Sequence, residues 1–285
     1  MSSPTLLTVG VVEGLHSAAM SNRMALVEAT VSGLRDATLP GLVEYLCLRH
    51  SAATFTLPPL PVSVTRSAVG TALQRVICPF GLRTAGGVTP NTSVNPSEAE
   101  FFFLRTEADY QSHAYGLYET RWARASEQIG LRAKQSLMQL AMTAMSENGL
   151  LHSYAPDGVL VGYRVLPHAA LFTVADLGRG VLGSLRSNTK YAHLAHHRDA
   201  LRMALRDGVT CLDSPGGNGF RQLFKALASQ FGTIRFRTGN VCLTMDGQYF
   251  DANLGDETFP ESVVGFQVTM CCRATADALG DSPLL

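Results

Sequence analysis

The order of hydrophobic patterns after residue 107 is the feature that most limits how this chain can fold. Two stretches with helical spacing, 108–129 and 133–151, come before two apolar strand candidates at 158–166 and 170–175. Further along, the patterns predict helices at 199–206 and 220–231 and strands at 233–238, 241–246 and 263–272. Turn-forming sequences at 238–240 and 246–247 favour antiparallel pairing of the late strands. This order predicts an α+β fold, a two-layer sandwich with helices on one face of the sheet.

The first hundred residues predict a smaller unit. Helical spacing at 17–37 and 66–76, on either side of a short apolar run, is typical of a small α/β layer. The segment 84–98 has the Gly, Pro, Asn and Ser content of a loop or linker, and a strand candidate follows at 101–104. We therefore expect a boundary near residue 105. It separates an N-terminal α/β domain (1–105), whose role the sequence does not indicate, from a second domain (106–285).

Charge and hydrophobicity exclude two classes of partner. The chain has 23 Lys and Arg against 23 Asp and Glu, so it has no general electrostatic attraction for nucleic acid or an acidic membrane surface. Its most apolar tract, 159–175, is interrupted by Arg164 and His168, which argues against a membrane-spanning helix. Any anion that this protein binds must therefore be held by a local arrangement of donors.

Cysteine usage and the N-terminus favour the cytoplasm. The six cysteines show neither a CxxC pair nor a metal-like spacing. No basic stretch precedes the short apolar run Leu6–Val12, which argues against a secretory signal. We expect reduced, mostly buried cysteines in a cytoplasmic protein.

The end of the helix predicted at 133–151 carries the first candidate site. Asn148 and His152 are four residues apart and therefore share a helical face. The amide oxygen of a helical Asn can bind a hard cation such as Mg²⁺ that also ligates phosphate oxygens. The competing interpretation, a polar residue near a helix end, is the commoner case for a single Asn.

A second candidate site follows the strand predicted at 170–175. Asp176 at its end can accept a hydrogen bond from an exocyclic amine. Gly178 and Gly180 would let the backbone lie against a flat ring, because neither has a Cβ. An ordinary Asp-Gly turn explains the same residues equally well.

A third candidate site is the glycine-rich entry to the helix predicted at 220–231. The backbone N–H groups of Gly217, Asn218 and Gly219 would meet phosphate at the positive end of the helix dipole. Such an entry is a weak signal alone. It is not a P-loop, because no GKS or GKT follows it.

Taken together and in this order, the three sites resemble the ATP-binding (Bergerat) domain of the GHKL superfamily. That group includes gyrase, heat-shock chaperones, histidine kinases and mismatch-repair ATPases. Asn148 matches the N box of the family, Asp176 with Gly178 and Gly180 the first Gly box, and Gly217 with Gly219 the second. The resemblance covers about residues 108–272. It looks closest to bacterial stand-alone ATP-binding regulators related to anti-sigma factor kinases.

The resemblance implies a role for each of these residues. Asp176 would bind the adenine amino group, Gly178 and Gly180 would line the purine, and Asn148 would coordinate Mg²⁺. The backbone at 217–219 would contact the phosphates of ATP. Members often place a further hydroxyl near adenine, and the comparable residue here is Ser262.

The segment between the two Gly boxes would be the ATP lid of the family. Arg186 and Lys190 are its candidate phosphate contacts, although both also fit an exposed, solvated loop. His193, His196 and His197 in the same segment have spacings that zinc sites use, but no Cys or acidic pair completes a site. We therefore interpret the three histidines as surface residues.

One departure from the family pattern concerns catalysis. Members that hydrolyse ATP usually have a Glu four residues before the Mg²⁺-binding Asn, where this chain has Ala144. Alanine cannot accept a proton. The remaining candidate catalytic residue is Glu147, which points about 100° away round the helix. Hydrolysis is therefore expected to be slow or absent, whereas phosphoryl transfer depends mostly on positioning and electrostatics.

Two functions follow from this pattern. One is a signalling protein that binds Mg·ATP and transfers the γ-phosphate to a Ser, Thr or His of a protein partner, as a homodimer or a monomer. The other is a catalytically silent module in which bound nucleotide controls a protein interaction. A structural domain that binds no nucleotide is the third interpretation.

Overall fold

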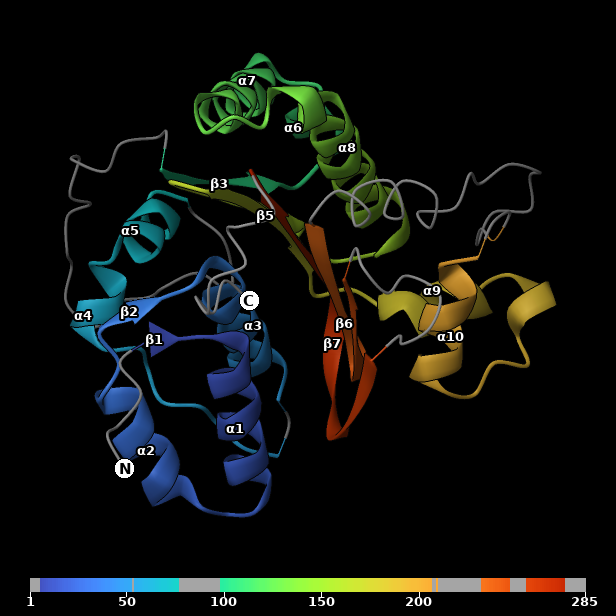
Figure 1. Ribbon diagram of the computed structural model, residues 1–285. Helices are drawn as coiled ribbons and strands as arrows, with labels where there is room; N and C mark the ends of the chain where they lie inside the picture. The colour runs from blue at the N-terminus through green and yellow to red at the C-terminus, as the bar shows by residue number, and fades with distance from the viewer. Residues whose placement is uncertain are drawn as a thin grey trace.

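The structure, a computed structural model, describes residues 6–52, 54–76, 98–206, 209, 232–246 and 255–274. Its centre is a five-stranded antiparallel sheet in the order β3-β4-β5-β7-β6 (Figure 1). The strands are β3 (Ala99–Leu104), β4 (Val159–Leu166), β5 (Ala169–Asp176), β6 (Gly232–Asp246) and β7 (Gly255–Arg273). β5 is buried along its whole length because β4 and β7 flank it and both faces of the sheet are covered. The α+β class predicted from the sequence is confirmed.

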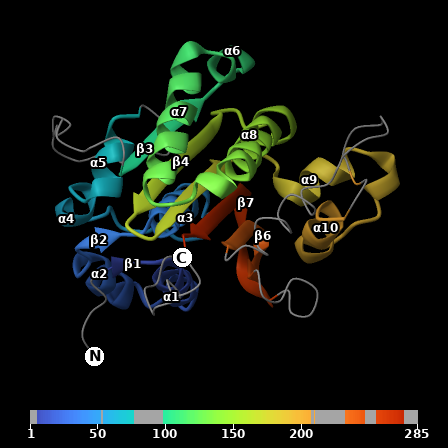
Figure 2. The same cartoon turned by 45° about the horizontal axis from the view of Figure 1, so that its top comes forward.

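One face of the sheet is covered by helices that follow β3. These are α6 (Glu107–Tyr110), α7 (His113–Gln128), the 3₁₀ turn η1 (Arg132–Lys134) and α8 (Gln135–His152). Figure 2 shows α7 and α8 side by side over the strands. Tyr118 and Trp122 of α7 pack against Tyr163 of β4, and Trp122 also contacts Phe172 of β5. This aromatic cluster is the centre of the core on that face.

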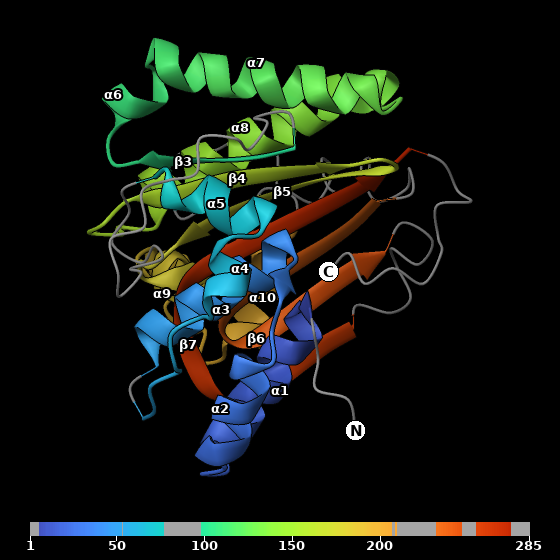
Figure 3. The same cartoon turned by 90° about the vertical axis from the view of Figure 1, so that its left-hand side faces the viewer.

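The opposite face is covered by the N-terminal part of the chain (Figure 3). Its elements are β1 (Leu6–Leu7), α1 (Val9–Met20), α2 (Met24–Ser32), β2 (Asp36–Ala37), α3 (Leu39–Ser51), α4 (Val62–Thr65) and α5 (Ala68–Gln74). β1 and β2 form a parallel pair, and Thr38 caps α3 by accepting a hydrogen bond from the N–H of Gly41. α3 lies against β5 and β7, and one apolar cluster includes Leu42 of α3 and Leu171 of β5. The first part of the chain therefore shares a core with the sheet.

This arrangement corrects the two-layer expectation. The sequence predicted helices on one face of the sheet, whereas the structure has a helical layer on each face. β3 lies before the predicted boundary at residue 105, yet it pairs with β4 as an edge strand of the same sheet. The boundary thus falls immediately after a strand of the main sheet.

A smaller helical group lies beside the β6 and β7 end of the sheet, away from the N-terminal helices (Figure 1). It comprises α9 (Gly180–Arg186), the 3₁₀ turn η2 (Thr189–Tyr191) and α10 (His197–Ala204). Leu182, Leu185 and Tyr191 form its own apolar cluster. α10 packs on β6, where the ring of His197 lies directly against Gly239.

Three predicted element boundaries are wrong for local reasons. The helix predicted at 108–129 is interrupted before His113, because Ser112 caps a new helix by accepting from the N–H of Tyr115. The stretch 17–37 contains the end of α1 and all of α2, with Asn22 between them at φ +56°. The turn predicted at 238–240 is absent, because β6 continues through it with a register shift at Gly239, whose φ is +56°.

Two sequence expectations about the chain as a whole can be compared with the described residues. In this part of the chain, no helix combines the length and apolar character that a bilayer crossing requires. The described cysteines (Cys47, Cys242, Cys271 and Cys272) are buried and form no disulfide. Burial raises the pKa of the Cys242, Cys271 and Cys272 thiols, so they remain protonated at neutral pH.

Candidate functional site

Asp176 is the last residue of β5 and the most unusual polar group of the described structure. Its side chain is 3% exposed, and Oδ1 accepts a hydrogen bond of 2.9 Å from the N–H of Gly178. Burial raises the pKa of the Asp176 carboxyl to about 7, although hydrogen bonds from the backbone N–H groups of Gly178 and Phe266 oppose the shift. Within the described residues, Asp176 forms no ion pair. The carboxyl is therefore buried with backbone donors alone.

Asp176, Phe266 and Thr238 form one row across three neighbouring strands. Asp176 of β5 is opposite Phe266 of β7, and Phe266 is opposite Thr238 of β6. Thr238 is buried, donates a hydrogen bond of 3.0 Å to the carbonyl of Gly265, and accepts one of 3.2 Å from the N–H of Val181. This hydroxyl thus ties the start of α9 to β6 and β7. The alternation of side chains along each strand places the row on the α7–α8 face of the sheet.

The glycines of this region have contacts that leave no room for a side chain. A Cβ on Gly178 would lie 2.1 Å from the carbonyl oxygen of Ser153, and one on Gly265 would lie 1.9 Å from that of Asp176. Gly180 has φ +65° and lies against Thr238 and Gly265. In this structure Gly178 and Gly180, which were predicted to line a purine, contact protein atoms. Their absence of a Cβ is already explained by close packing of the backbone.

The end of α8 is fastened to the turn after Asp176. The N–H of Arg179 donates a hydrogen bond of 2.8 Å to the carbonyl of Ser153, and its Nε donates one of 3.1 Å to the carbonyl of His152. The guanidinium carbon of Arg179 lies 4.0 Å from the ring centre of Tyr154. Arg179 therefore satisfies the carbonyls at the negative end of the α8 dipole. The helix of Asn148 and the strand of Asp176 form one rigid corner.

Asn148 lies four residues before this corner and is half-buried. Its Nδ2 donates a hydrogen bond of 2.6 Å to the carbonyl of Ala144, so Oδ1 is the amide atom left for a cation. Glu147 is exposed and lies one position round the helix. Burial, and secondly the charge of Arg179, lower the pKa of His152, so this imidazole is neutral at pH 7.

The other predicted site residues are exposed or lie outside the described part of the chain. Arg186 at the end of α9 and Lys190 in η2 are exposed, as is Ser262 in β7. The Nζ of Lys190 lies 5.3 Å from the ring centre of Tyr191. The proposed phosphate contacts Gly217, Asn218 and Gly219 lie outside the described residues.

A small pocket borders this region on the side of α3. Its lining includes Asp176, Gly265, Phe266 and, from α3, Glu44 and Cys47. The volume of this cavity, measured as the space open to the centre of a water-sized molecule, is about 10 Å³. Sites for drug-sized ligands usually measure about 300–1,000 Å³. The pocket is therefore too small for a nucleotide, and it faces α3 rather than α8.

Sequence reasoning missed Thr238, Gly265 and Arg179. Gly265 is brought to Asp176 by the pairing of β5 with β7, and Thr238 by the further pairing of β7 with β6. Arg179 had a local signal, because it lies between the two glycines that were singled out.

Comparisons with protein-family models, with curated proteins and with solved structures find no match for this chain. In the part of the chain that the structure describes, no group of three or more His, Cys, Asp or Glu side chains has the geometry of a metal site. A functional proposal therefore depends on the geometry around Asp176.

Proposed function

We propose that this protein binds Mg·ATP in a GHKL-type site and acts as a cytoplasmic regulator of a signalling partner. The observation that carries the proposal is the buried Asp176 carboxyl at the end of β5. A buried carboxyl without an ion pair is destabilising, and such groups concentrate at functional sites. An amino group of adenine would give this acceptor a polar partner.

The other parts of the proposed site follow from the same corner of the fold. Because Arg179 fastens α8 to the turn after Asp176, the distance between Asn148 and Asp176 is fixed by rigid elements. Oδ1 of Asn148 is an oxygen ligand of the kind that Mg²⁺ prefers. Bound Mg·ATP would supply a γ-phosphoryl group for transfer. Side chains between the end of β5 and α8 must move to admit it, because Asp176 is buried and the pocket described above faces α3, on the other side of the sheet from α8.

Two forms of this function differ in chemistry. Ala144 replaces the usual catalytic Glu, and the exposed Glu147 points elsewhere, which favours a silent module in which ATP controls binding to a protein partner. Transfer of phosphate to a protein Ser, Thr or His is the alternative, because such transfer needs positioning more than a base.

Calorimetry tests the binding proposal directly. We expect the wild type to bind ATP with Mg²⁺, and Asp176→Asn to bind at least tenfold more weakly. Glu28→Gln is the matched control, since it removes the charge of an exposed carboxylate on α2, far from the site. Equal affinities of wild type and Asp176→Asn for ATP would refute the assignment of the adenine carboxylate.

Proton release gives a second, independent readout. With a pKa of about 7, the Asp176 carboxyl is mostly protonated at pH 6, whereas binding of an amino group favours the carboxylate. Titrations at pH 6 in two buffers of different ionisation enthalpy should show release of close to one proton in the wild type. The same titration of Asp176→Asn, at protein concentrations that allow saturation, should show none.

Labelled ATP separates the silent module from the kinase. Incubation with candidate protein partners should leave them unlabelled if the module is silent. Ala144→Glu restores the carboxylate one turn before Asn148, and slow hydrolysis that appears only in this variant would support the silent module. Transfer of label to a partner by the wild type would instead establish the kinase.

A further inference from the structure

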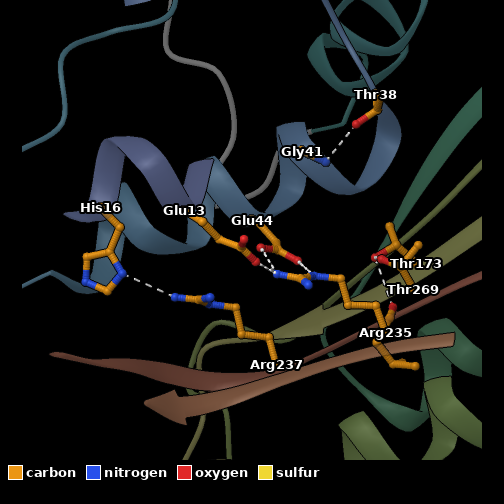
Figure 4. Close-up of polar contacts among 10 residues, drawn as sticks. Glu13, His16, Thr38, Gly41, Glu44, Thr173, Arg235, Arg237 and Thr269 are labelled. Carbon is orange, nitrogen blue, oxygen red and sulfur yellow. Dashed lines mark hydrogen bonds and ion pairs between the residues drawn. The ribbon is translucent and has the colours of Figure 1, made fainter. Parts of the chain in front are cut away.

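A buried charge network joins the N-terminal helices to β6. Arg235 of β6 is directed toward α1 and α3, where its Nε donates to Oε1 of Glu44 at 2.6 Å and its Nη2 to Oε2 at 3.3 Å (Figure 4). The same Nη2 also contacts Oε1 of Glu13. The Arg235 side chain is 7% exposed and that of Glu44 is 1% exposed. This guanidinium is therefore shared between two helices of the N-terminal part.

A second contact lies two residues along the same strand. Nη2 of Arg237 is 3.4 Å from Nδ1 of His16 on α1, and the His16 ring lies 5.6 Å from that of Phe55 (Figure 4). Arg237 and the residue opposite it on β7, Gln267, are both buried. The N-terminal helices thus hold this stretch of β6 at two points.

These contacts lie directly behind the row that contains Asp176. Arg237 of β6 is paired with Gln267 of β7. The next pair consists of Thr238, which follows Arg237, and Phe266, which precedes Gln267. Side chains of neighbouring residues point to opposite faces of a sheet. Arg237 and Gln267 therefore face the N-terminal helices, while Thr238 and Phe266 face α7 and α8 on the side of Asp176.

A buried ion pair of this kind fixes geometry more than it adds stability. Desolvation of the charges offsets most of their attraction, but loss of one member leaves an uncompensated charge. The bidentate contact between Arg235 and Glu44 also restricts orientation, because the guanidinium fork fits a carboxylate in one plane. The position of β6 and β7 relative to α3 is therefore narrowly defined.

We propose that Glu44 and Arg235 are positioning residues, through which the N-terminal part of the chain holds Thr238, Gly265 and Phe266 in place beside Asp176 and so sets nucleotide affinity. This inference rests on the proposed ATP site. It gives the N-terminal part a role in that site, because loss of the contacts with α1 or α3 would loosen β6 and β7 at the Asp176 row.

Three variants test this proposal by calorimetry with ATP and Mg²⁺. Glu44→Gln removes the central carboxylate without changing its shape, and it should weaken ATP binding at least tenfold. Glu13→Gln removes the outer carboxylate and should have a smaller effect in the same direction. Arg164→Gln is the control, because Nη1 of Arg164 holds the N-terminal part at a different place, by a hydrogen bond of 2.9 Å to the carbonyl of Ala37.

A merely structural role predicts a different pattern. In that case all three variants would lower the melting temperature and leave ATP affinity unchanged, or would weaken binding in proportion to lost stability. Wild-type affinity in Glu44→Gln, or equal weakening in Arg164→Gln, would overturn the inference. Failure of the wild type itself to bind ATP would instead refute the proposed function.

Hydrogen exchange provides a readout that needs no nucleotide. Phe266 lies directly opposite Asp176 in the β5–β7 ladder, so the exchange rate of its N–H reports on the contact between β7 and the end of β5. We expect at least tenfold faster exchange in Glu44→Gln than in Arg164→Gln under native conditions. If Glu44→Gln does not fold, the same measurement on Glu13→Gln decides the matter, and equal exchange in Glu13→Gln and Arg164→Gln refutes the positioning role.

Discussion

The raised pKa of Asp176 predicts a specific dependence of stability on pH. The carboxyl has an ordinary pKa of 3.8 in the unfolded chain and a pKa of about 7 in the folded protein. Between these values the unfolded chain has lost its proton while the folded protein retains it, so stability falls as the pH rises from about 4 to about 7. Above pH 7 both states are ionised, and the full cost is on the order of 4 kcal/mol.

Asp176→Asn removes this ionisation and therefore the pH dependence that it causes. The Asn Oδ1 can still accept from the N–H of Gly178, but its NH₂ group would face the N–H of Phe266. That mismatch costs about 1–3 kcal/mol at every pH. Between pH 5 and pH 8, the stability of Asp176→Asn relative to wild type should rise by about 2.5 kcal/mol.

Urea unfolding of both proteins at pH 5 and pH 8 measures this difference. The comparison with wild type cancels the contributions of the other titrating groups. A difference between Asp176→Asn and wild type that is constant to about 0.5 kcal/mol would show that Asp176 titrates normally. The argument from its burial would then fail.

Three further substitutions test the geometry around Asp176 by their effect on the free energy of unfolding, and Gly116→Ala provides a contrast. Gly265→Ala should cost at least about 2 kcal/mol, because φ is +86° and the new Cβ would meet the carbonyl of Asp176; an unchanged midpoint would contradict this backbone conformation. Gly116→Ala, in an exposed turn of α7 with no atom near the new Cβ, should instead stabilise by about 0.5–1 kcal/mol. Thr238→Val should cost about 1–3 kcal/mol, since it leaves the N–H of Val181 without its acceptor, and a neutral result would mean that water replaces the hydroxyl. Arg179→Gln should cost about 1 kcal/mol and destabilise the end of α8 first, which hydrogen exchange of that turn would detect.

The elements that could be predicted are those with a strong local signal. β4 and β5 were expected at 158–166 and 170–175 and lie within one residue of those limits. Both are continuous apolar runs, because they are buried on both faces of the sheet. These continuous apolar runs also indicated a helical layer on the second face, because the strands of a sheet with one solvated face have alternating polar residues.

β6 was predicted as two strands because residues 238–240 have the composition of a turn, and the burial of its arginines was not predicted. Its Thr, Ile, Arg, Phe and Arg residues alternate as they would in a half-exposed strand, whereas Arg235 and Arg237 are buried. The partner that makes this burial tolerable, Glu44, is almost two hundred residues earlier, within the apolar stretch 39–48 of α3. A lone acidic residue within that apolar stretch was the local sign of the pair.

The candidate site was predictable only where its residues have a local sequence signal. Asp176 was found because a strand-end carboxyl is a local feature, and the structure places it in a buried row with residues of β6 and β7. Ser262 was proposed as the accompanying hydroxyl from the resemblance to the family, whereas the hydroxyl that lies in this row is that of Thr238. Strand pairing, which brings Thr238 there, has no local sequence signature.

The glycines and Asp176 do not support the ATP proposal equally. Gly178 and Gly265 are required by backbone contacts within the protein, so a fold that binds no nucleotide would need them too. Asp176 is different. The two backbone N–H groups that donate to its carboxyl require an acceptor but not a negative charge, so a neutral side chain at this position would avoid most of the cost of ionisation at neutral pH. A carboxyl that is retained against a penalty on the order of 4 kcal/mol is the feature that packing alone does not explain. The pH dependence of stability and the proton released on ATP binding are therefore the decisive measurements, because both depend on the ionisation of this one carboxyl.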